Sequence, residues 1–407
     1  MNHYKIHIPR THSLDRIGAK AHGLLKLAAH GFNVPKAVLL DAAAVEDILG
    51  SRRELNSDET VALCKLLVDL PRAATLAVRS SGRVSMPGIL ITETGVSQRI
   101  PAILDAVRKV AASWFTDRAV SYRRTYRLAE KFDMGIVVQH YIAPVTGIYR
   151  SGVLLTRDPL TGAAAIRIET VPGPGAGLVD GRTAPDRSTE GLPMGKFEAL
   201  ARNLETVFKR PIDAEFVYDG QRIYVVQARP MRHLSPPAWL QVATDMMQQA
   251  ILTTEEAGAL LGATGGSKAP WWLKVDQQQA KPPFATGLGS VPGAFTGRLA
   301  LHPPYDQHSI FGALTTEVDD AADMMTCGGI LTGIGGITCH ASMLARAAGI
   351  PAVVNAAFHL RDANSAVFHV SKHQQVVVEH GALLTIDGAT GNVYRGRQPI
   401  VDSRPNV

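Results

Sequence analysis

The stretch that decides the fold is residues 328–354, GGILTGIGGITCHASMLARAAGIPAVV. Its Ile-Leu-Thr run predicts a short strand, and the glycine-rich GIGG that follows predicts a turn. Residues 341–348 then have the composition of a helix, which ends at Gly349 in the C′ position, and the proline two residues later opens another strand. A strand, a turn, a helix and a strand in this order predict an α/β unit with His340 at the start of its helix.

The position of His340 has a chemical consequence. Backbone N–H groups and the positive end of the helix dipole favour an anion at a helix N-terminus. The same field disfavours an imidazolium, so the ring is expected to be neutral and nucleophilic, as a transient phosphohistidine requires. Spacing alone leaves two alternatives open. The histidine could only cap the helix, or it could join Cys327 and Cys339 in a zinc site, although no CxxC or HxxxH pair near the loop supports that.

Composition sets the broad class. The chain has 407 residues, 46% of them hydrophobic and 19% charged, which predicts two or three packed domains and excludes wholesale disorder. No apolar run reaches the ~18 residues of a membrane span, and the first residues lack an apolar signal core. We therefore expect an unprocessed, cytoplasmic protein without a membrane partner. Three cysteines are too few for a disulfide framework.

The charge is unevenly distributed. The formal net charge is +6, and the positive excess lies in the first 285 residues. Nucleic acid is the usual partner of a basic protein, but aromatic residues are not interleaved with a Lys/Arg run. The exception is one predicted helix with Arg118, Arg123, Arg124 and Arg127. A site for a polyanionic small molecule such as ATP explains the excess at least as well, and nucleic acid is not predicted as a partner.

The histidine segment resembles the phosphohistidine signature of the PEP-utilising enzymes, the family of pyruvate phosphate dikinase, PEP synthase and rifampin phosphotransferase. Residues 290–297 and 381–396 resemble the edges of that family's swivelling histidine domain. The resemblance implies that His340 accepts a phosphoryl group from ATP. It also implies that Thr338 and Arg346 steady the loop and the phosphoryl group. On their own, these two residues would be a cap hydroxyl and a helix-surface arginine.

The first 235 residues resemble the same family's ATP-grasp domain. Residues 17–40 are similar to its opening segment, in which Lys20 holds the place of a phosphate-binding lysine. Residues 77–88, AVRSSGRVSMPG, resemble the dikinase loop, and Arg79 matches its ATP-binding arginine. Without the resemblance, both cations would be ordinary surface charges.

A second segment of this half resembles the part that binds the adenine ring. Residues 136–142, IVVQHYI, look like the hinge strand that reads adenine through backbone groups. The resemblance places Gln139, Tyr141 and Ile142 at the nucleotide. Residues 151–162, SGVLLTRDPLTG, also match the family.

Two short strands around Asp-Gly predict a hairpin whose polar residues share faces. Asp213 lies two residues before Glu215, and Gln227 lies two before Arg229. The two pairs converge only if the turn holds an odd number of residues, for example 219–221 with a left-handed glycine. A solvated hairpin face fits the pattern too.

The family's DxE…QxR pattern matches these residues one by one. It implies that Glu215 and Gln227 bind Mg²⁺ and phosphate oxygens, that Arg229 binds phosphates, and that Asp213 lies in the site or directly behind it. One departure concerns the glycine-rich loop, where relatives of PEP synthase read GLGE and this chain has Ala176 in place of the acid. No Walker A sequence occurs, so a P-loop kinase is excluded.

We predict a multidomain α/β and α+β chain in three parts. Residues 1–235 are an ATP-grasp nucleotide-binding domain with two subdomains, 236–285 a linker with one helical arm over 240–261, and 286–400 a swivelling phosphohistidine domain. The resemblance covers nearly the whole chain, but the sequence has no counterpart of the family's C-terminal pyruvate/PEP barrel. It therefore does not identify the acceptor.

The expected activity is a dikinase-like phosphotransferase. ATP with Mg²⁺ phosphorylates His340 and leaves as AMP, and the phosphoryl group passes to an acceptor, preferably a small molecule. One alternative is the N-terminal half of a split dikinase that acts with a separate pyruvate/PEP subunit. Another is a non-catalytic nucleotide-binding relative.

Overall fold

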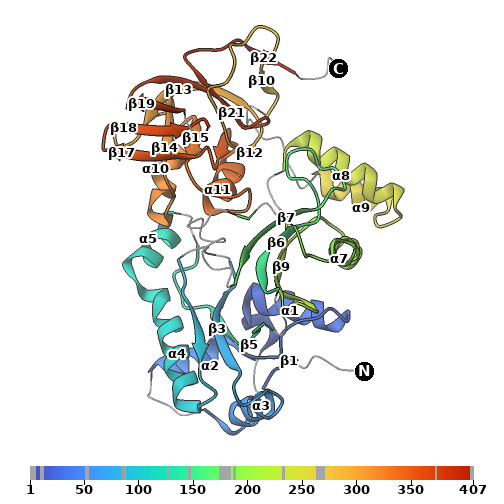
Figure 1. The fold of residues 1–407 in the computed structure, drawn as a ribbon. Helices are drawn as coiled ribbons and strands as arrows, with labels where there is room; N and C mark the ends of the chain where they lie inside the picture. Colours follow the sequence, from blue (N-terminus) through green and yellow to red (C-terminus); the bar gives the residue numbers. More distant parts are fainter. Residues whose placement is uncertain are drawn as a thin grey trace. The chain divides into compact units, whose positions relative to one another are not determined.

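The chain divides into two compact units in the computed structural model (Figure 1). The first unit joins residues 1–151 to 214–229, and the second joins 152–213 to 230–407. The predicted boundaries at 235 and 285 cut the chain differently and stay a prediction. The structure describes residues 6–9, 13–50, 55–84, 86, 89–125, 128–144, 148–173, 185–186, 189–231, 234–262, 271–371 and 374–403.

The first unit is built on a five-stranded sheet with the order β1-β2-β5-β3-β4. Its strands are β1 Ile6–His7, β2 Ala37–Leu40, β3 Thr75–Gly82, β4 Thr92–Val96 and β5 Met134–Tyr141. The central strand β5 runs antiparallel to β2 and β3, and Gln139 lies opposite Ala77 of β3. Gln139 therefore lies on β5 two residues beyond the residue that is paired with Arg79. The predicted strands near 76–78 and 136–139 are thus present and longer than expected.

The first unit has five α-helices among its described residues. They are α1 Gly18–Ala29, α2 Ala42–Gly50, α3 Ser57–Val68, α4 Ile100–Ala112 and α5 Asp117–Thr125, besides the 3-10 turns η1 Leu14–Arg16 and η2 Ser113–Phe115. The sequence pattern over residues 101–131 predicts one helix, and this prediction is wrong, because Thr116 is extended and its hydroxyl accepts the N–H of Ala119 at the start of α5. Arg123 of α5 is buried, with its guanidinium 4.3 Å from the Trp114 ring centre. That arginine is therefore part of the core packing.

A four-stranded sheet has the order β7-β6-β8-β9. Its strands are β6 Arg150–Leu155, β7 Arg167–Pro172, β8 Ile212–Tyr218 and β9 Ile223–Pro230, and helix α7 spans Met194–Phe208. The predicted hairpin is present, but four residues, 219–222, separate its strands, so the prediction of a turn with an odd number of residues is wrong. The carboxylate of Asp219 accepts the N–H groups of Gln221 and Arg222, which widens the turn. Gly220 has φ +97°, as the prediction of a left-handed glycine requires.

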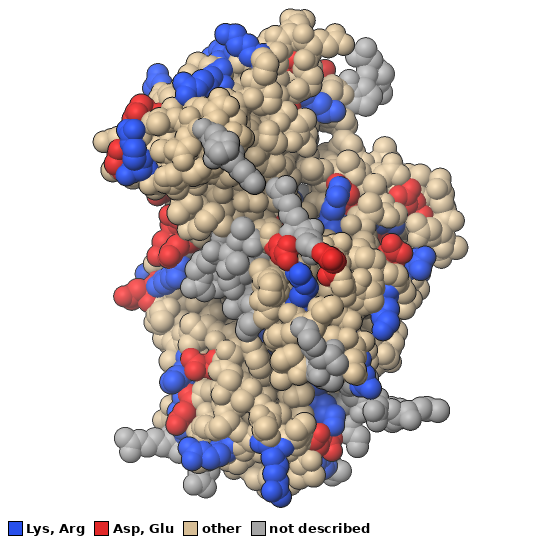
Figure 2. All heavy atoms as spheres, viewed as in Figure 1, with Lys and Arg blue, Asp and Glu red and all other residues tan. Residues whose placement is uncertain are grey.

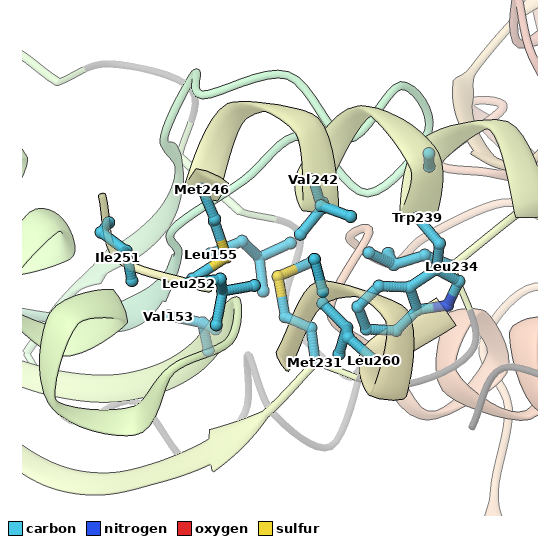
Figure 3. Close-up of a cluster of buried hydrophobic side chains, with 13 residues drawn as sticks. Val153, Leu155, Met231, Leu234, Trp239, Val242, Met246, Ile251, Leu252 and Leu260 are labelled. Atoms are coloured by element: carbon cyan, nitrogen blue, oxygen red, sulfur yellow. The ribbon is translucent and has the colours of Figure 1, made fainter. Parts of the chain in front are cut away.

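The predicted helical arm is two helices, α8 Pro236–Gln248 and α9 Thr254–Gly262. Ala250 has φ +55°, and Thr253 and Glu256 exchange hydrogen bonds as the capping box of α9. Both helices pack on β6 around the buried side chains drawn in Figure 3. That cluster contains Val153, Leu155, Met231, Leu234, Ala238, Trp239, Val242, Ala243, Met246, Ile251, Leu252, Ala257 and Leu260. The arm is therefore part of a hydrophobic core.

The C-terminal part of the second unit is dominated by an eight-stranded sheet with the order β11-β21-β20-β13-β14-β15-β16-β12. Neighbours among β13, β14, β15 and β16 pair in parallel, and the other pairs are antiparallel. The strands are β11 Ala285–Thr286, β12 Leu288–Val291, β13 Ala294–Ala300, β14 Ser309–Ala313, β15 Gly329–Thr332, β16 Ala352–Val354, β20 Leu383–Asp387 and β21 Asn392–Arg395. This mixed sheet confirms the predicted α/β class.

Short elements complete this part. They are the sheet of β17 Phe358–Asp362, β18 Ser365–His369 and β19 Gln375–Glu379, the pair β10 Leu273–Val275 and β22 Ile400–Asp402, turn η3 Val318–Asp320, and helices α10 Ala321–Thr326 and α11 His340–Ala348. Helix α11 connects β15 to β16, as predicted, and ends at Gly349 with φ +69°.

Two general features concern the surface and the helices. On the face drawn in Figure 2, basic and acidic side chains are interspersed. Within the described ranges, no helix is both long enough and apolar enough to cross a bilayer.

Candidate functional site

The start of helix α1 lies directly against strand β3. Gly18 has φ +81°, and a Cβ there would be 1.7 Å from the carbonyl oxygen of Ser81, so only glycine fits. The Ser81 hydroxyl accepts the N–H of Ala21 at 3.1 Å and satisfies one of the free donors of the first helical turn. This close packing brings the first turn of α1, which carries Lys20, beside the strand that carries Arg79.

Arg79 links strands β3, β5, β8 and β9 of the first unit. Its Nη2 donates to Glu215 Oε2 at 3.0 Å and lies 3.4 Å from Gln227 Oε1. Its Nη1 donates to the Val226 carbonyl at 2.6 Å and lies 3.5 Å from Gln139 Oε1. Arg79, Glu215, Gln227 and Gln139 therefore come together, as the resemblance implied.

The charges around Lys20 are out of balance. Burial lowers the pKa of Lys20 to about 8, and the positive charges of Arg79 and Arg229 lower it further, against the opposing effect of Glu215. Two cationic groups and one carboxylate thus act on the ammonium group of Lys20. We call Lys20, Arg79, Glu215 and Arg229 the cationic cluster. A bound polyanion would restore the balance and stabilise the ammonium form of Lys20.

Gln139 adds a donor to this cluster. Its side chain is 2% exposed, and its Nε2 has no hydrogen-bond partner in the described part of the chain. A buried amide donor without a partner is costly, so its position beside Arg79 fits a ligand that supplies an acceptor.

Glu215 and Gln227 offer oxygen ligands for a divalent cation. Both side-chain oxygens approach the same atom, Arg79 Nη2, so they face a common point. The described residues contain no group of three His, Cys, Asp or Glu that could hold a metal by itself. One carboxylate and one amide oxygen fit Mg²⁺, which takes its remaining ligands from water and phosphates.

The other residues predicted for the nucleotide are less informative. Tyr141 ends β5 and is half-buried, and Ile142 is buried with its carbonyl accepting the Tyr149 hydroxyl at 2.9 Å. Asp213 is half-buried on β8, where the division between the two units falls. The roles of these residues stay predictions, and so does the effect of Ala176, which lies outside the described residues.

In the second unit, His340 is the first residue of α11 and follows Cys339, its N-cap residue. Its side chain is 5% exposed. Arg346 donates to the carbonyls of Ile337 at 2.8 Å and Ser290 at 3.4 Å, so it holds the loop before the helix. Arg346 thus contacts two backbone carbonyls, and its predicted role toward the loop and the phosphoryl group stays a prediction.

The zinc alternative gains no support. Burial raises the pKa of the Cys327 thiol to about 11 and also raises the pKa of the Cys339 thiol. Cys339 Sγ instead lies 3.6 Å from the Ser342 hydroxyl. In the described ranges no metal-binding group includes either cysteine.

Glu169 is the residue that the sequence patterns missed. Its Oε1 accepts the N–H of Ile337 at 2.6 Å, and its Oε2 accepts the N–H of Thr338 at 3.1 Å and the Thr338 hydroxyl at 2.5 Å. Burial raises the pKa of Glu169, and these bonds and the charge of Arg346 partly oppose the rise. In the sequence, Glu169 is a lone acid inside the strand RIETVP, whereas the family resemblance places its acid in the loop after this strand.

Known families match two segments of the chain in the predicted order. Residues 52–196 match the family "Pyruvate phosphate dikinase, AMP/ATP-binding domain", and residues 305–391 match "PEP-utilising enzyme, mobile domain". The first segment contains Arg79, Gln139 and Glu169, and the second contains His340.

Similar curated proteins carry related names. "Pyruvate, phosphate dikinase" of Rickettsia felis is 27% identical over 315 residues, which cover 73% of this chain and 35% of that protein. The protein of the same name from Clostridium symbiosum is 28% identical, with 72% and 35% covered. "Probable phosphoenolpyruvate synthase" of Archaeoglobus fulgidus is 24% identical over 362 residues, with 75% and 41% covered. The matched region thus spans little more than a third of the length of these relatives.

Partial likenesses to solved structures also occur. D-alanine–D-alanine ligase of Bacillus anthracis in complex with ATP has 14% identity and a TM-score of 0.28 over 61% of this chain and 66% of that one. L-amino acid ligase of Bacillus licheniformis has 15% identity and a TM-score of 0.32 over 69% and 59%. The two family matches and the named relatives are the decisive finding: the chain belongs to the PEP-utilising enzyme family.

Proposed function

We propose that this chain is an ATP-dependent phosphotransferase that phosphorylates its own His340, releases AMP and passes the phosphoryl group to an acceptor. The observation that carries the proposal is the cationic cluster, in which Arg79 pairs with Glu215 and the charges of Arg79, Arg229 and Glu215 all act on the ammonium group of Lys20. A family match to an AMP/ATP-binding domain over residues 52–196 supports a nucleotide as the anion.

The cluster residues have distinct roles in this proposal. Lys20, Arg79 and Arg229 bind phosphate oxygens and stabilise the charge that develops on them during transfer. Glu215 and Gln227 would hold a magnesium ion, whose chemistry there is to neutralise phosphate charge. Gln139 donates its free amide N–H to the nucleotide.

His340 acts as the nucleophile. A ring nitrogen forms a bond to phosphorus as the bond from that phosphorus to the AMP oxygen breaks. The second product is phosphate or pyrophosphate, according to whether water or phosphate takes the remaining phosphoryl group. Because the His340 ring is buried in the second unit, its loop has to leave its present packing before the reaction. This requirement supports the predicted swivelling of the histidine domain.

The proposed acceptor is a small molecule. A second candidate is pyruvate held by a separate polypeptide, because the curated relatives are named for pyruvate and are much longer than the matched region. Both acceptors use the same phosphohistidine.

The experiment incubates the purified chain with ATP and Mg²⁺ and measures AMP together with an acid-labile phosphopeptide covering residues 337–346. His340→Ala is expected to lose both signals. His359→Ala, at an exposed histidine of the same unit, is the matched control and is expected to keep them. Water, phosphate and pyruvate are then compared as co-substrates. Undiminished AMP formation in His340→Ala would remove the histidine from the mechanism.

A further inference from the structure

We infer that Glu169 is a positioning residue that latches the histidine loop, residues 336–338, and thereby keeps His340 buried until the latch opens. That opening precedes phosphorylation, a statement that rests on the proposed function. The latch itself is a property of the second unit alone, to which both Glu169 and the loop belong.

Three donors of the loop converge on one carboxylate. Glu169 receives two backbone N–H groups, from Ile337 and Thr338, and the hydroxyl of Thr338. Both Glu169 and Thr338 are buried, so water does not compete effectively for these bonds. Hydrogen bonds to an ionised group are about twice as strong as neutral ones. The three bonds therefore form a strong attachment between β7 and the loop.

Gly336 makes this attachment possible. A Cβ at Gly336 would be 2.5 Å from Glu169 Oε2 and 2.6 Å from Oε1, well inside van der Waals contact. The carboxylate thus occupies the space in which any other residue would carry its side chain. The last glycine of the GIGG turn allows the close approach of Glu169, which the sequence spacing did not indicate.

Packing beside the carboxylate reinforces the latch. Ile337 packs against the hydrophobic cluster of β6, α8 and α9 that Figure 3 draws. On the other side of the loop, Arg346 donates to the Ile337 carbonyl. The loop is therefore held through its N–H groups, one carbonyl and one apolar side chain, and His340 follows it by two residues.

The chemistry requires a carboxylate. An ionised carboxylate only accepts, and all three loop groups donate. In Glu169→Gln one of the two side-chain polar atoms becomes an NH₂ group, which would face an N–H donor. Glu169→Gln therefore keeps nearly the same side-chain shape but removes one of the two acceptor atoms. Thr338→Val removes the hydroxyl donor, and Thr338→Ser keeps it and serves as the matched control.

The test measures access to His340 without any nucleotide. The full-length chain is treated with diethyl pyrocarbonate, and the modification rate of each histidine is followed by peptide mass spectrometry. His308, which is exposed in the same unit, is the internal reference. We expect the His340 rate relative to His308 to rise about tenfold in Glu169→Gln, the size expected when a hydrogen bond to a charged group is lost. Thr338→Val is expected to raise it several-fold, and Thr338→Ser to leave it near the wild-type value.

An unchanged ratio in both Glu169→Gln and Thr338→Val would overturn the latch. Loss of the folded-state circular dichroism signal of Glu169→Gln at the labelling temperature would indicate general unfolding and would also count against the latch for this variant. In that case, the comparison of Thr338→Val with Thr338→Ser decides whether the latch exists. Because no ATP is present, this result is independent of whether His340 is phosphorylated. Failure of the latch and failure of the proposed function are therefore distinguishable.

Discussion

The cationic cluster of the first unit and the histidine loop of the second differ in how their charges are satisfied. In the cluster, burial and the positive charges of Arg79 and Arg229 lower the pKa of Lys20 to about 8, and the carboxylate of Glu215 opposes this shift. In the loop, the donors already share the carboxylate of Glu169. The first region places positive charges around Lys20 and is suited to receive an anion. The second holds its own anion and has to release it before its donors can do anything else.

The largest expected effect is on the cationic cluster. Arg79→Ala should lower the rate of ATP-dependent AMP formation by about 10²-fold or more, because it removes phosphate contacts that act during transfer. Arg83→Ala, at an exposed arginine just beyond the same strand, is the control and should retain the wild-type rate. Equal rates in the two variants would mean that Arg79 serves only to pair with Glu215.

A substitution at Gly336 should disrupt the attachment of the histidine loop to Glu169. Gly336→Ala should lower the free energy of unfolding by about 1–3 kcal/mol, because its Cβ would collide with the Glu169 carboxylate. Thermal or urea unfolding measures this loss. Gly195→Ala in helix α7, where a Cβ meets nothing within 4 Å, is the matched control and should be neutral or stabilising by about 0.5–1 kcal/mol. A neutral Gly336→Ala would contradict the close contact with Glu169.

The pH dependence of ATP affinity tests the contribution of the Lys20 ammonium group to the cationic cluster. Since its pKa is about 8, the ammonium form dominates at pH 7 and is lost as the pH rises to 9. ATP affinity should fall by up to about tenfold over this range, and calorimetric titrations at each pH would measure the decrease. Lys20→Met should remove the lysine's part of the pH dependence, and Lys26→Met, at an exposed lysine of the same helix, should not.

Stability should respond to the same titration in the opposite direction. The pKa of Lys20 is about 8 in the folded chain and 10.5 for an ordinary lysine, so the unfolded state binds more protons between these values. The contribution of Lys20 to the free energy of unfolding therefore increases as the pH rises from 8 to 10.5. A contribution that decreased in that window would contradict the lowered pKa.

The smallest expected effect concerns the contact that positions Lys20. Ser81→Ala removes the hydroxyl that accepts the Ala21 N–H, and should cost about 1 kcal/mol of stability, as the loss of a helix cap does. Chemical denaturation measures this loss. ATP affinity should fall with it if the cap orients the first turn of α1, and unchanged affinity would assign Ser81 a purely structural role.

Sequence patterns predicted a helix or strand well where residues within or next to that element determine it. Helix α11, its glycine C-cap and the strands around it follow from residues 328–354 alone. The positions at which one element ends and the next begins were harder to predict from the sequence. The arm over 240–261 reads as one helix because its apolar period continues, and only the capping box of Thr253 and Glu256 marks the second start. The turn after β8 is one residue longer than predicted, because the Asp219 side chain satisfies the backbone.

By itself, the sequence determined the elements, the glycine-rich turn before His340 and the resemblance that assigns Lys20, Arg79 and the hairpin to a nucleotide. Such features depend on neighbouring residues, whose periodicity and caps act over a few positions. Only the tertiary structure decided which distant groups meet. Glu169 and Thr338 are 169 positions apart, and Arg79 and Gln227 are 148 apart. Their contacts arise because buried donors and acceptors must pair, and nothing in the local sequence specifies which partner satisfies them.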